Sequence, residues 1–249
     1  MKLKLLFAAL LLSTYSIAGS IQIAVAANVS YAIDDLKKAF NEIHPDIKVQ
    51  VVLGSSGKLT AQIKHGAPYQ LFMSANMKYP EALYKDKIAV TEPLVYAQGT
   101  LAYLSPKTQD LSKGMMLTKE VTIKKIAVAN PKTAPYGKAT VEAMKNASVY
   151  KDVKHKFVFA ESISQTVSYT VTATDLGFIA KSSLYSPKMK QYEEGIHWKE
   201  VDPKWYTPIK QGMVILKKGE SNVEVRAFYD FMLSQKAQEI LTEFGYLLP

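Results

Sequence analysis

The sequence predicts an α/β fold with two lobes, each a mostly parallel sheet flanked by helices. Two observations support this prediction. Short apolar runs alternate with amphipathic helical stretches, a pattern that is typical of parallel strands covered by helices on both faces. The alternation restarts near the middle of the chain after a longer β-prone stretch, which indicates a second α/β unit.

The first series of elements has the order β-α-β-α-β. Apolar residues at Ile33, Leu36 and Phe40 recur at helical spacing, and this helix stops before Pro45. The next helix carries Leu59 and ends near Gly66. The expected strands cover residues 21–27, 47–53 and 70–75.

The second series begins after the β-prone stretch 94–106, which is broken at Gly99. No Gly/Ser-rich or Pro-rich linker is present, so we expect extended strands to join the lobes. The expected lobes are residues 19–97 with 210–249, and residues 98–209. The expected strands cover 126–129, 157–160, 177–180 and 213–216, with helices after the turns 130–137 and 161–162 and closing helices around 223–233 and 237–244.

Residues 1–18 are predicted to be a secretory signal peptide. Two lysines precede a short apolar run, and Ser16 and Ala18 occupy the small-residue positions of a cleavage site. The 249-residue chain has no Cys, which excludes disulfides, thiolate metal sites and a lipid-modified N-terminal Cys. We therefore expect a periplasmic protein that is not lipid-anchored.

The mature chain would carry 29 basic and 22 acidic residues, a net charge near +7. The lysines are mostly scattered doublets, with one looser cluster at Lys151, Lys154 and Lys156. No recognition helix or RNA-binding motif accompanies them. We interpret this charge as a solvated basic surface and expect no nucleic-acid partner.

Two early strand-to-helix turns consist of small polar residues, Ala26 to Ser30 and Gly54 to Gly57. The N-terminus of a helix carries unpaired backbone N–H groups and a partial positive charge. Two such termini aimed at one point would bind an anion without Lys or Arg. The alternative for the second turn is a plain capped turn without a ligand.

Other motifs argue against catalysis and nucleotide binding. The Gly54 turn lacks the Walker A spacing, and it also lacks the spacing of a nucleophile elbow. The four His residues show no metal-ligand spacing, and no paired-carboxylate motif is present. We therefore expect no enzyme activity, no cofactor and no directly bound metal cation.

Two later turns add candidate anion donors. Pro131 and Pro135 stiffen the loop before Tyr136 and Gly137, where a helix begins. Ser162 is positioned to cap the helix that starts at Ile163. Each turn alone is common in α/β proteins, but four in two matched lobes favour a site between the lobes.

The sequence resembles the molybdate-binding proteins of ABC importers, the ModA type of two-lobed periplasmic binding protein. The resemblance covers nearly the whole mature chain. The segment Gly66-Ala67-Pro68 followed by 71–75 (LFMSA) is particularly specific to this family. The matching stretches are AVAANVSYAIDDL (24–36), GSSGKLTAQIKHGAPYQLFMSAN (54–76), ANPKTAPYGKATVEAM (129–144), AESISQTV (160–167), DLGFIAKSSL (175–184) and VRAFYDFMLSQKAQEILTEFGY (225–246).

The resemblance implies a class II type of periplasmic-binding-protein fold with the ligand in the cleft. It also implies oxyanion contacts from Asn28 and Ser56, each through side chain and main chain, and from the backbone of Tyr136 and Ile163. The side chain of Tyr136 stays an open question. Ala180 aligns with a position where some relatives use a Tyr hydroxyl, and Ala cannot make that contact.

By this resemblance the chain would be a monomer that binds molybdate or tungstate and delivers it to a membrane permease. An all-donor site favours fully deprotonated anions and rejects phosphate, which brings a proton of its own. Sulfate has the charge and shape of molybdate and would be excluded only by size. The alternatives are the same fold binding another small anion such as sulfate, a secreted hydrolase, and an adhesive domain.

Overall fold

The computed structural model describes residues 19–249, and the predicted signal peptide, 1–18, lies outside the described residues. Within residues 19–249, no helix has the length and apolar character needed to cross a membrane. The strands are β1 (Gly19–Ala26), β2 (Ile47–Gly54), β3 (Leu71–Ser74), β4 (Leu94–Gly99), β5 (Leu101–Leu104), β6 (Ile126–Ala129), β7 (Phe157–Ala160), β8 (Leu176–Ala180), β9 (Trp198–Glu200) and β10 (Ile209–Ile215). The α-helices are α1 (Ile33–Ile43), α2 (Ser56–Lys64), α3 (Lys78–Lys85), α4 (Pro135–Asn146), α5 (Tyr150–Val153), α6 (Ile163–Thr172), α7 (Val223–Met232) and α8 (Gln235–Glu243).

The strands form two five-stranded sheets, with orders β2-β1-β3-β10-β4 and β7-β6-β8-β5-β9. In each sheet one strand runs against the other four: β10 is antiparallel to β3 and β4, and β5 is antiparallel to β8 and β9. The remaining pairs are parallel. Both sheets are thus mostly parallel in direction, as the sequence predicted.

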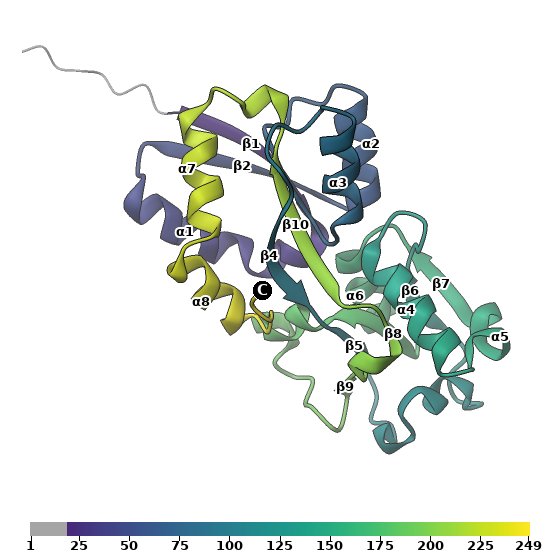
Figure 1. Cartoon of the computed structure of the whole chain (residues 1–249). Helices are drawn as coiled ribbons and strands as arrows, with labels where there is room; N and C mark the ends of the chain where they lie inside the picture. The colour runs from purple at the N-terminus through teal and green to yellow at the C-terminus, as the bar shows by residue number, and fades with distance from the viewer. Residues whose placement is uncertain (1–18) are drawn as a thin grey trace, which may run out of the picture.

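Helices cover both faces of the first sheet because its strands are apolar on both faces. Along β1, Ile21, Ile23 and Val25 pack in the core beneath α1, α7 and α8. Ala24 points the other way, into the core beneath α2 and α3. In Figure 1, α1 and α7 lie on one side of this sheet and α2 and α3 on the other.

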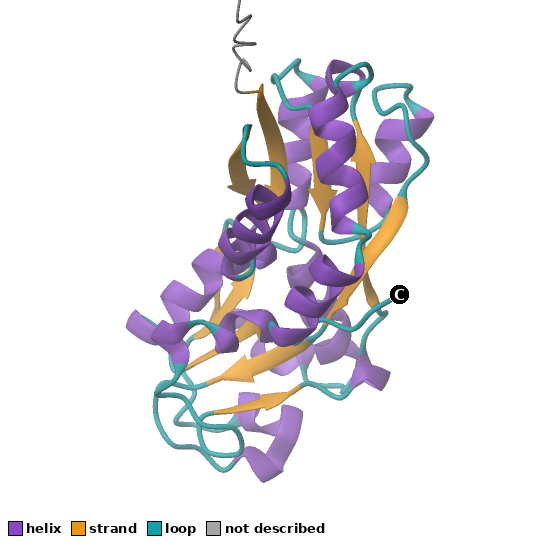
Figure 2. Cartoon of the chain, turned by 90° about the vertical axis from the view of Figure 1, so that its left-hand side faces the viewer, coloured by secondary structure: helices purple, strands orange, loops and turns teal. Residues whose placement is uncertain are grey.

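The second sheet has the same construction. Ile126, Val128 and Phe178 pack with residues of α4 in one core. Ile179 and Ala102 pack on the opposite face with Val167 of α6. Figure 2 shows the two sheets, each with its helices, one above the other.

Extended chain joins the two sheets. Gly99 ends β4 in the first sheet, and Leu101 begins β5 in the second. Chain that leaves the second sheet after β9 re-enters the first at β10. The chain ends between the two sheets, where Leu247 pairs with Gln98 of β4 (Figure 1).

The structure adds elements that the sequence pattern did not indicate. Helix α3 begins at Lys78, has Pro80 in its first turn, where proline is tolerated, and buries Leu83. A short 3-10 helix, η2 (Leu111–Lys119), and strand β9 also fall outside the predicted elements. Helix α3 has eight residues, η2 is kinked at Gly114 and β9 has three residues, so none shows a continuous apolar periodicity in the sequence.

Candidate functional site

All four predicted oxyanion contacts line one small cavity between the two sheets. The volume open to the centre of a water molecule inside it is about 10 Å³, so the cavity suits a compact ligand. Residues from both sheets and their helices form its wall. The lining residues are Ala26, Ala27, Asn28, Gly54, Ser55, Ser56, Ala75, Ala134, Pro135, Tyr136 and Ile163.

Four helices begin at this cavity. They are the 3-10 helix η1 (Ala27–Tyr31), which leads into α1, and helices α2, α4 and α6. The residues that precede η1, α2 and α4 make no side-chain capping bond. Only α6 is capped, by Ser162, whose Oγ accepts a hydrogen bond from the N–H of Gln165. Uncapped helix starts leave backbone donors free for a ligand.

No Lys, Arg, His, Asp or Glu lines the cavity. Its positive potential therefore comes from N–H dipoles at the helix starts rather than from full charges. Tyr136 is its one ionisable group, and burial raises the pKa of Tyr136 well above its ordinary value. The hydroxyl stays protonated across the physiological range.

Asn28 is fully buried, and its amide nitrogen is already engaged. Asn28 Nδ2 donates to Oε1 of Gln211 at 2.7 Å and to the hydroxyl oxygen of Tyr246 at 3.0 Å. The backbone carbonyl oxygen of Asn28 accepts hydrogen bonds from the hydroxyls of Tyr246 (2.8 Å) and Ser182 (3.1 Å). The side-chain donor expected from Asn28 is thus used inside the protein, and its backbone N–H is the donor left for a ligand.

Ser56 keeps its hydroxyl hydrogen available. Its Oγ accepts a hydrogen bond from the N–H of Ala75 at 3.0 Å, which fixes the side chain against the end of β3. Ser55 is also buried, and its Oγ has no hydrogen-bond partner within residues 19–249. The same is true of Asn28 Oδ1. Two of the residues that line the cavity therefore hold buried polar atoms without a partner.

The side chain of Tyr136 contacts the first sheet. Its hydroxyl lies 3.5 Å from Nε2 of Gln211, which donates to it, and the ring is buried. A Cβ at Gly99 would fall 1.9 Å from the Tyr136 hydroxyl, so only glycine leaves room for the phenol there. The side chain of Tyr136 thus reaches from α4 into the first sheet, and Tyr136 also lines the cavity.

Ala180 is buried at the end of β8 and does not line the cavity. It packs in the same apolar core as Ala26, Ala27 and Ile163. The position therefore contributes packing rather than a hydroxyl.

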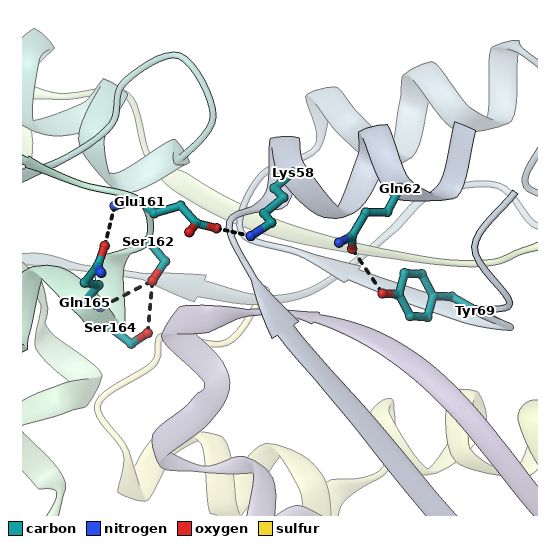
Figure 3. Close-up of polar contacts among 7 residues, drawn as sticks. All are labelled: Lys58, Gln62, Tyr69, Glu161, Ser162, Ser164 and Gln165. Atoms are coloured by element: carbon teal, nitrogen blue, oxygen red, sulfur yellow. Dashed lines mark hydrogen bonds and ion pairs between the residues drawn. The ribbon is translucent and has the colours of Figure 1, made fainter. Parts of the chain in front are cut away.

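Contacts between the two halves of the molecule, each a sheet with its helices, lie around the cavity. The N–H of Gly57 donates to the carbonyl of Thr133 at 2.8 Å. Lys58 and Glu161 form an exposed ion pair at 2.6 Å that joins the start of α2 to the turn before α6 (Figure 3). The structure thus has the two halves in contact around the cavity.

Sequence reasoning missed Gln211, Tyr246 and Ser55. Gln211 could have been noticed, because it is a polar residue within a strand that is otherwise largely apolar and buried. Tyr246 and Ser55 carry no such signal, since Tyr and Ser are ordinary residues near chain ends and helix starts.

No group of three or more His, Cys, Asp or Glu side chains in the described part of the chain is arranged to hold a metal ion.

The model of the bacterial extracellular solute-binding protein family matches residues 21–247. The chain is 34% identical over 238 residues to the molybdate-binding protein ModA of Azotobacter vinelandii, covering 95% of this chain and 93% of that protein. It is also 34% identical over 234 residues to ModA of Rhodobacter capsulatus, covering 92% and 89%.

A solved structure, the periplasmic molybdate-binding protein of Azotobacter vinelandii, superposes with a TM-score of 0.85. The match covers 92% of this chain and 99% of that one at 29% identity. The fold is therefore the two-lobed periplasmic-binding-protein fold that the resemblance implied. The family consists of binding proteins, which confirms the expectation that the chain is not an enzyme. The chain belongs to the bacterial extracellular solute-binding proteins and, within them, to the ModA family.

Proposed function

We propose that this protein captures molybdate, and also tungstate, in the cavity between its sheets and delivers it to an ABC transporter. Asn28, Ser56, Tyr136 and Ile163 are the proposed oxyanion-binding residues. The observation that carries the proposal is the meeting of four helix N-termini at one cavity without charged side chains. The ModA relatives, which are named for molybdate binding, support the choice of anion.

The chemistry follows from hydrogen bonding. A tetrahedral dianion entering the cavity loses its hydration shell, and fixed N–H and O–H donors replace it. The Ser56 hydroxyl and the backbone N–H groups of Asn28, Tyr136 and Ile163 are the proposed donors. Each charge-assisted bond contributes about 1.5–3 kcal/mol. Because helices hold these donors, little reorganisation within either sheet and its helices accompanies binding.

The donor set also determines selectivity. Molybdate and tungstate have the same charge and geometry and nearly the same size, so the site should accept both. Hydrogen phosphate carries a proton that would need an acceptor. Sulfate matches the charge but is smaller, so its oxygens would reach fewer of the fixed donors.

We further propose that residues 19–97 with 210–249 form one lobe and residues 98–209 the other. Donors on both lobes make the anion a bridge that stabilises their closed arrangement, which a transporter can recognise. The predicted signal peptide and the lack of Cys support a protein that diffuses in the periplasm without a lipid anchor, and we propose that it is a monomer.

Calorimetric titration of the mature, anion-stripped protein tests the proposal. Molybdate and tungstate should each bind tightly at one to one, whereas sulfate and phosphate give little or no heat. Tight sulfate binding with weak molybdate binding would assign the site to the alternative anion. No heat from any of the four would refute the oxyanion proposal.

A further inference from the structure

We propose that Tyr246 and Gln211 are positioning residues for the anion site, so that the C-terminal tail is part of the binding machinery. Neither residue lines the cavity. Both act through Asn28, whose side chain and carbonyl they hold. This inference rests on the proposed function, in which the turn at Asn28 supplies a donor to the anion.

The tail reaches the site because it is fixed to β4. Gln98 and Leu247 exchange two backbone hydrogen bonds, each 2.8 Å long. This pairing places the neighbouring Tyr246 side chain inside the protein, where it is 2% exposed. The chain end between the two sheets is visible in Figure 1.

The hydrogens around Asn28 can be assigned one by one. The Tyr246 hydroxyl donates its single hydrogen to the Asn28 carbonyl, so its oxygen is left to accept from Asn28 Nδ2. Gln211 Oε1 accepts the second hydrogen of Asn28 Nδ2 and also that of the Tyr96 hydroxyl, at 2.9 Å. Both hydrogens of the Asn28 amide are thus used, and the orientation of the carboxamide is fixed.

The same network includes residues associated with the second sheet. Nε2 of Gln211 donates to the hydroxyl of Tyr136, in the first turn of α4. Ser182 follows β8 and donates to the backbone carbonyl of Asn28. The network is therefore complete only when the two halves are in contact. The orientation of Asn28 therefore depends on the contact between the two halves that form the cavity.

The network therefore fixes the direction in which the backbone N–H of Asn28, the proposed anion donor, points. Tyr246→Phe leaves one Asn28 amide hydrogen without an acceptor and removes one donor from the Asn28 carbonyl. The turn could then adopt other orientations, and the anion would have to order it on binding. Affinity should fall although no residue that touches the anion has changed.

The test compares Tyr246→Phe with Tyr96→Phe. Both substitutions remove one buried hydroxyl from the same network, but only Tyr246 contacts Asn28. Molybdate titration should show about tenfold weaker binding for Tyr246→Phe and a change within about twofold for Tyr96→Phe. Urea unfolding of the anion-free proteins checks that both variants fold.

A spectroscopic measurement separates positioning from general destabilisation. The side-chain NH2 signal of Asn28, assigned by its loss in Asn28→Asp, should exchange hydrogen slowly in the wild type and in Tyr96→Phe. It should exchange quickly in Tyr246→Phe. Unchanged exchange, or equal losses of affinity in both Tyr variants, would overturn the inference. A wild type that binds no molybdate would refute the proposed function, and the exchange measurement would still decide the positioning role.

Discussion

Two adjacent serines at the start of α2 differ in what their hydroxyls do. Ser56 Oγ accepts from the N–H of Ala75, whereas Ser55 Oγ has no partner within residues 19–249 although it is buried. Ser55 also occupies the N-cap position, where a serine would ordinarily cap its own helix. Both residues line the cavity. The pair therefore allows the binding and folding roles of single hydroxyls to be separated.

Ser56→Ala should weaken molybdate binding by about 1–3 kcal/mol, because a hydroxyl donor to a charged ligand is lost. The variant should still fold, since the substitution leaves only the Ala75 N–H without its side-chain acceptor. Calorimetry measures the affinity, and thermal unfolding of the anion-free protein is the control. Wild-type affinity in a folded Ser56→Ala protein would remove Ser56 from the site.

Ser55→Ala should not lower the free energy of unfolding of the anion-free protein. No hydrogen bond is lost, and a buried hydroxyl that costs about 1–3 kcal/mol when unpaired is removed. Urea denaturation without anion provides the measurement. A loss of more than about 1 kcal/mol, the usual cost of removing a capping Ser, would mean that Ser55 caps α2 in solution.

Helix starts define the site at the level of elements, and these were the most predictable features of the chain. Apolar periodicity and turn residues located the beginnings of α2, α4 and α6, because those signals lie within a few residues of each other. The insertion of β10 between β3 and β4 was not predictable, since it depends on pairing between distant strands. The orientation of Asn28 likewise depends on partners 183 and 218 residues away.

Gly57→Ala should weaken molybdate binding by about tenfold or more. A Cβ at this position would lie 2.9 Å from Cα of Thr133, a backbone atom across the boundary between the halves, and 2.7 Å from the Tyr79 hydroxyl, the end of a flexible side chain in the first half. Alanine favours a helix over glycine by about 1 kcal/mol, so the stability of the first half should not suffer. Molybdate titration measures the affinity, and unfolding of the anion-free protein measures the stability. Together they separate an effect on closure of the two halves from an effect on stability.

Lys58→Gln is the matched control for this substitution at the next residue. It removes an ion pair whose side chains are both about half exposed, and such pairs contribute about 0–1 kcal/mol. Equal affinities of Gly57→Ala and the wild type would contradict the close approach of α2 to the Thr133 loop. A loss in Lys58→Gln as large as that in Gly57→Ala would mean that the loss does not depend on the added Cβ.

Several tyrosine hydroxyls are buried in the folded protein, and they affect how its free energy of unfolding changes at alkaline pH. Burial raises the pKa of Tyr246 to about 12 and that of Tyr103 to about 12. In the unfolded chain both titrate near pH ~10. The folded state therefore holds protons that the unfolded state releases in alkali.

The free energy of unfolding should be unaffected by these groups below pH ~10 and should fall as the pH rises from ~10 to ~12. Chemical denaturation at a series of alkaline pH values measures this slope. Tyr103→Phe, which lies outside the site, should make the slope shallower. Stability that rises between pH ~10 and ~12 would contradict the burial of these hydroxyls.

We propose that the anion lies at the helix N-termini between the two sheets and not on the basic surface. The most direct test is the position of tungsten in crystals grown with tungstate, located by its anomalous scattering. We expect one strong peak in the cavity lined by Asn28, Ser56, Tyr136 and Ile163. A peak instead in the surface hollow lined by Lys145, Lys151 and Lys154 would contradict the claim.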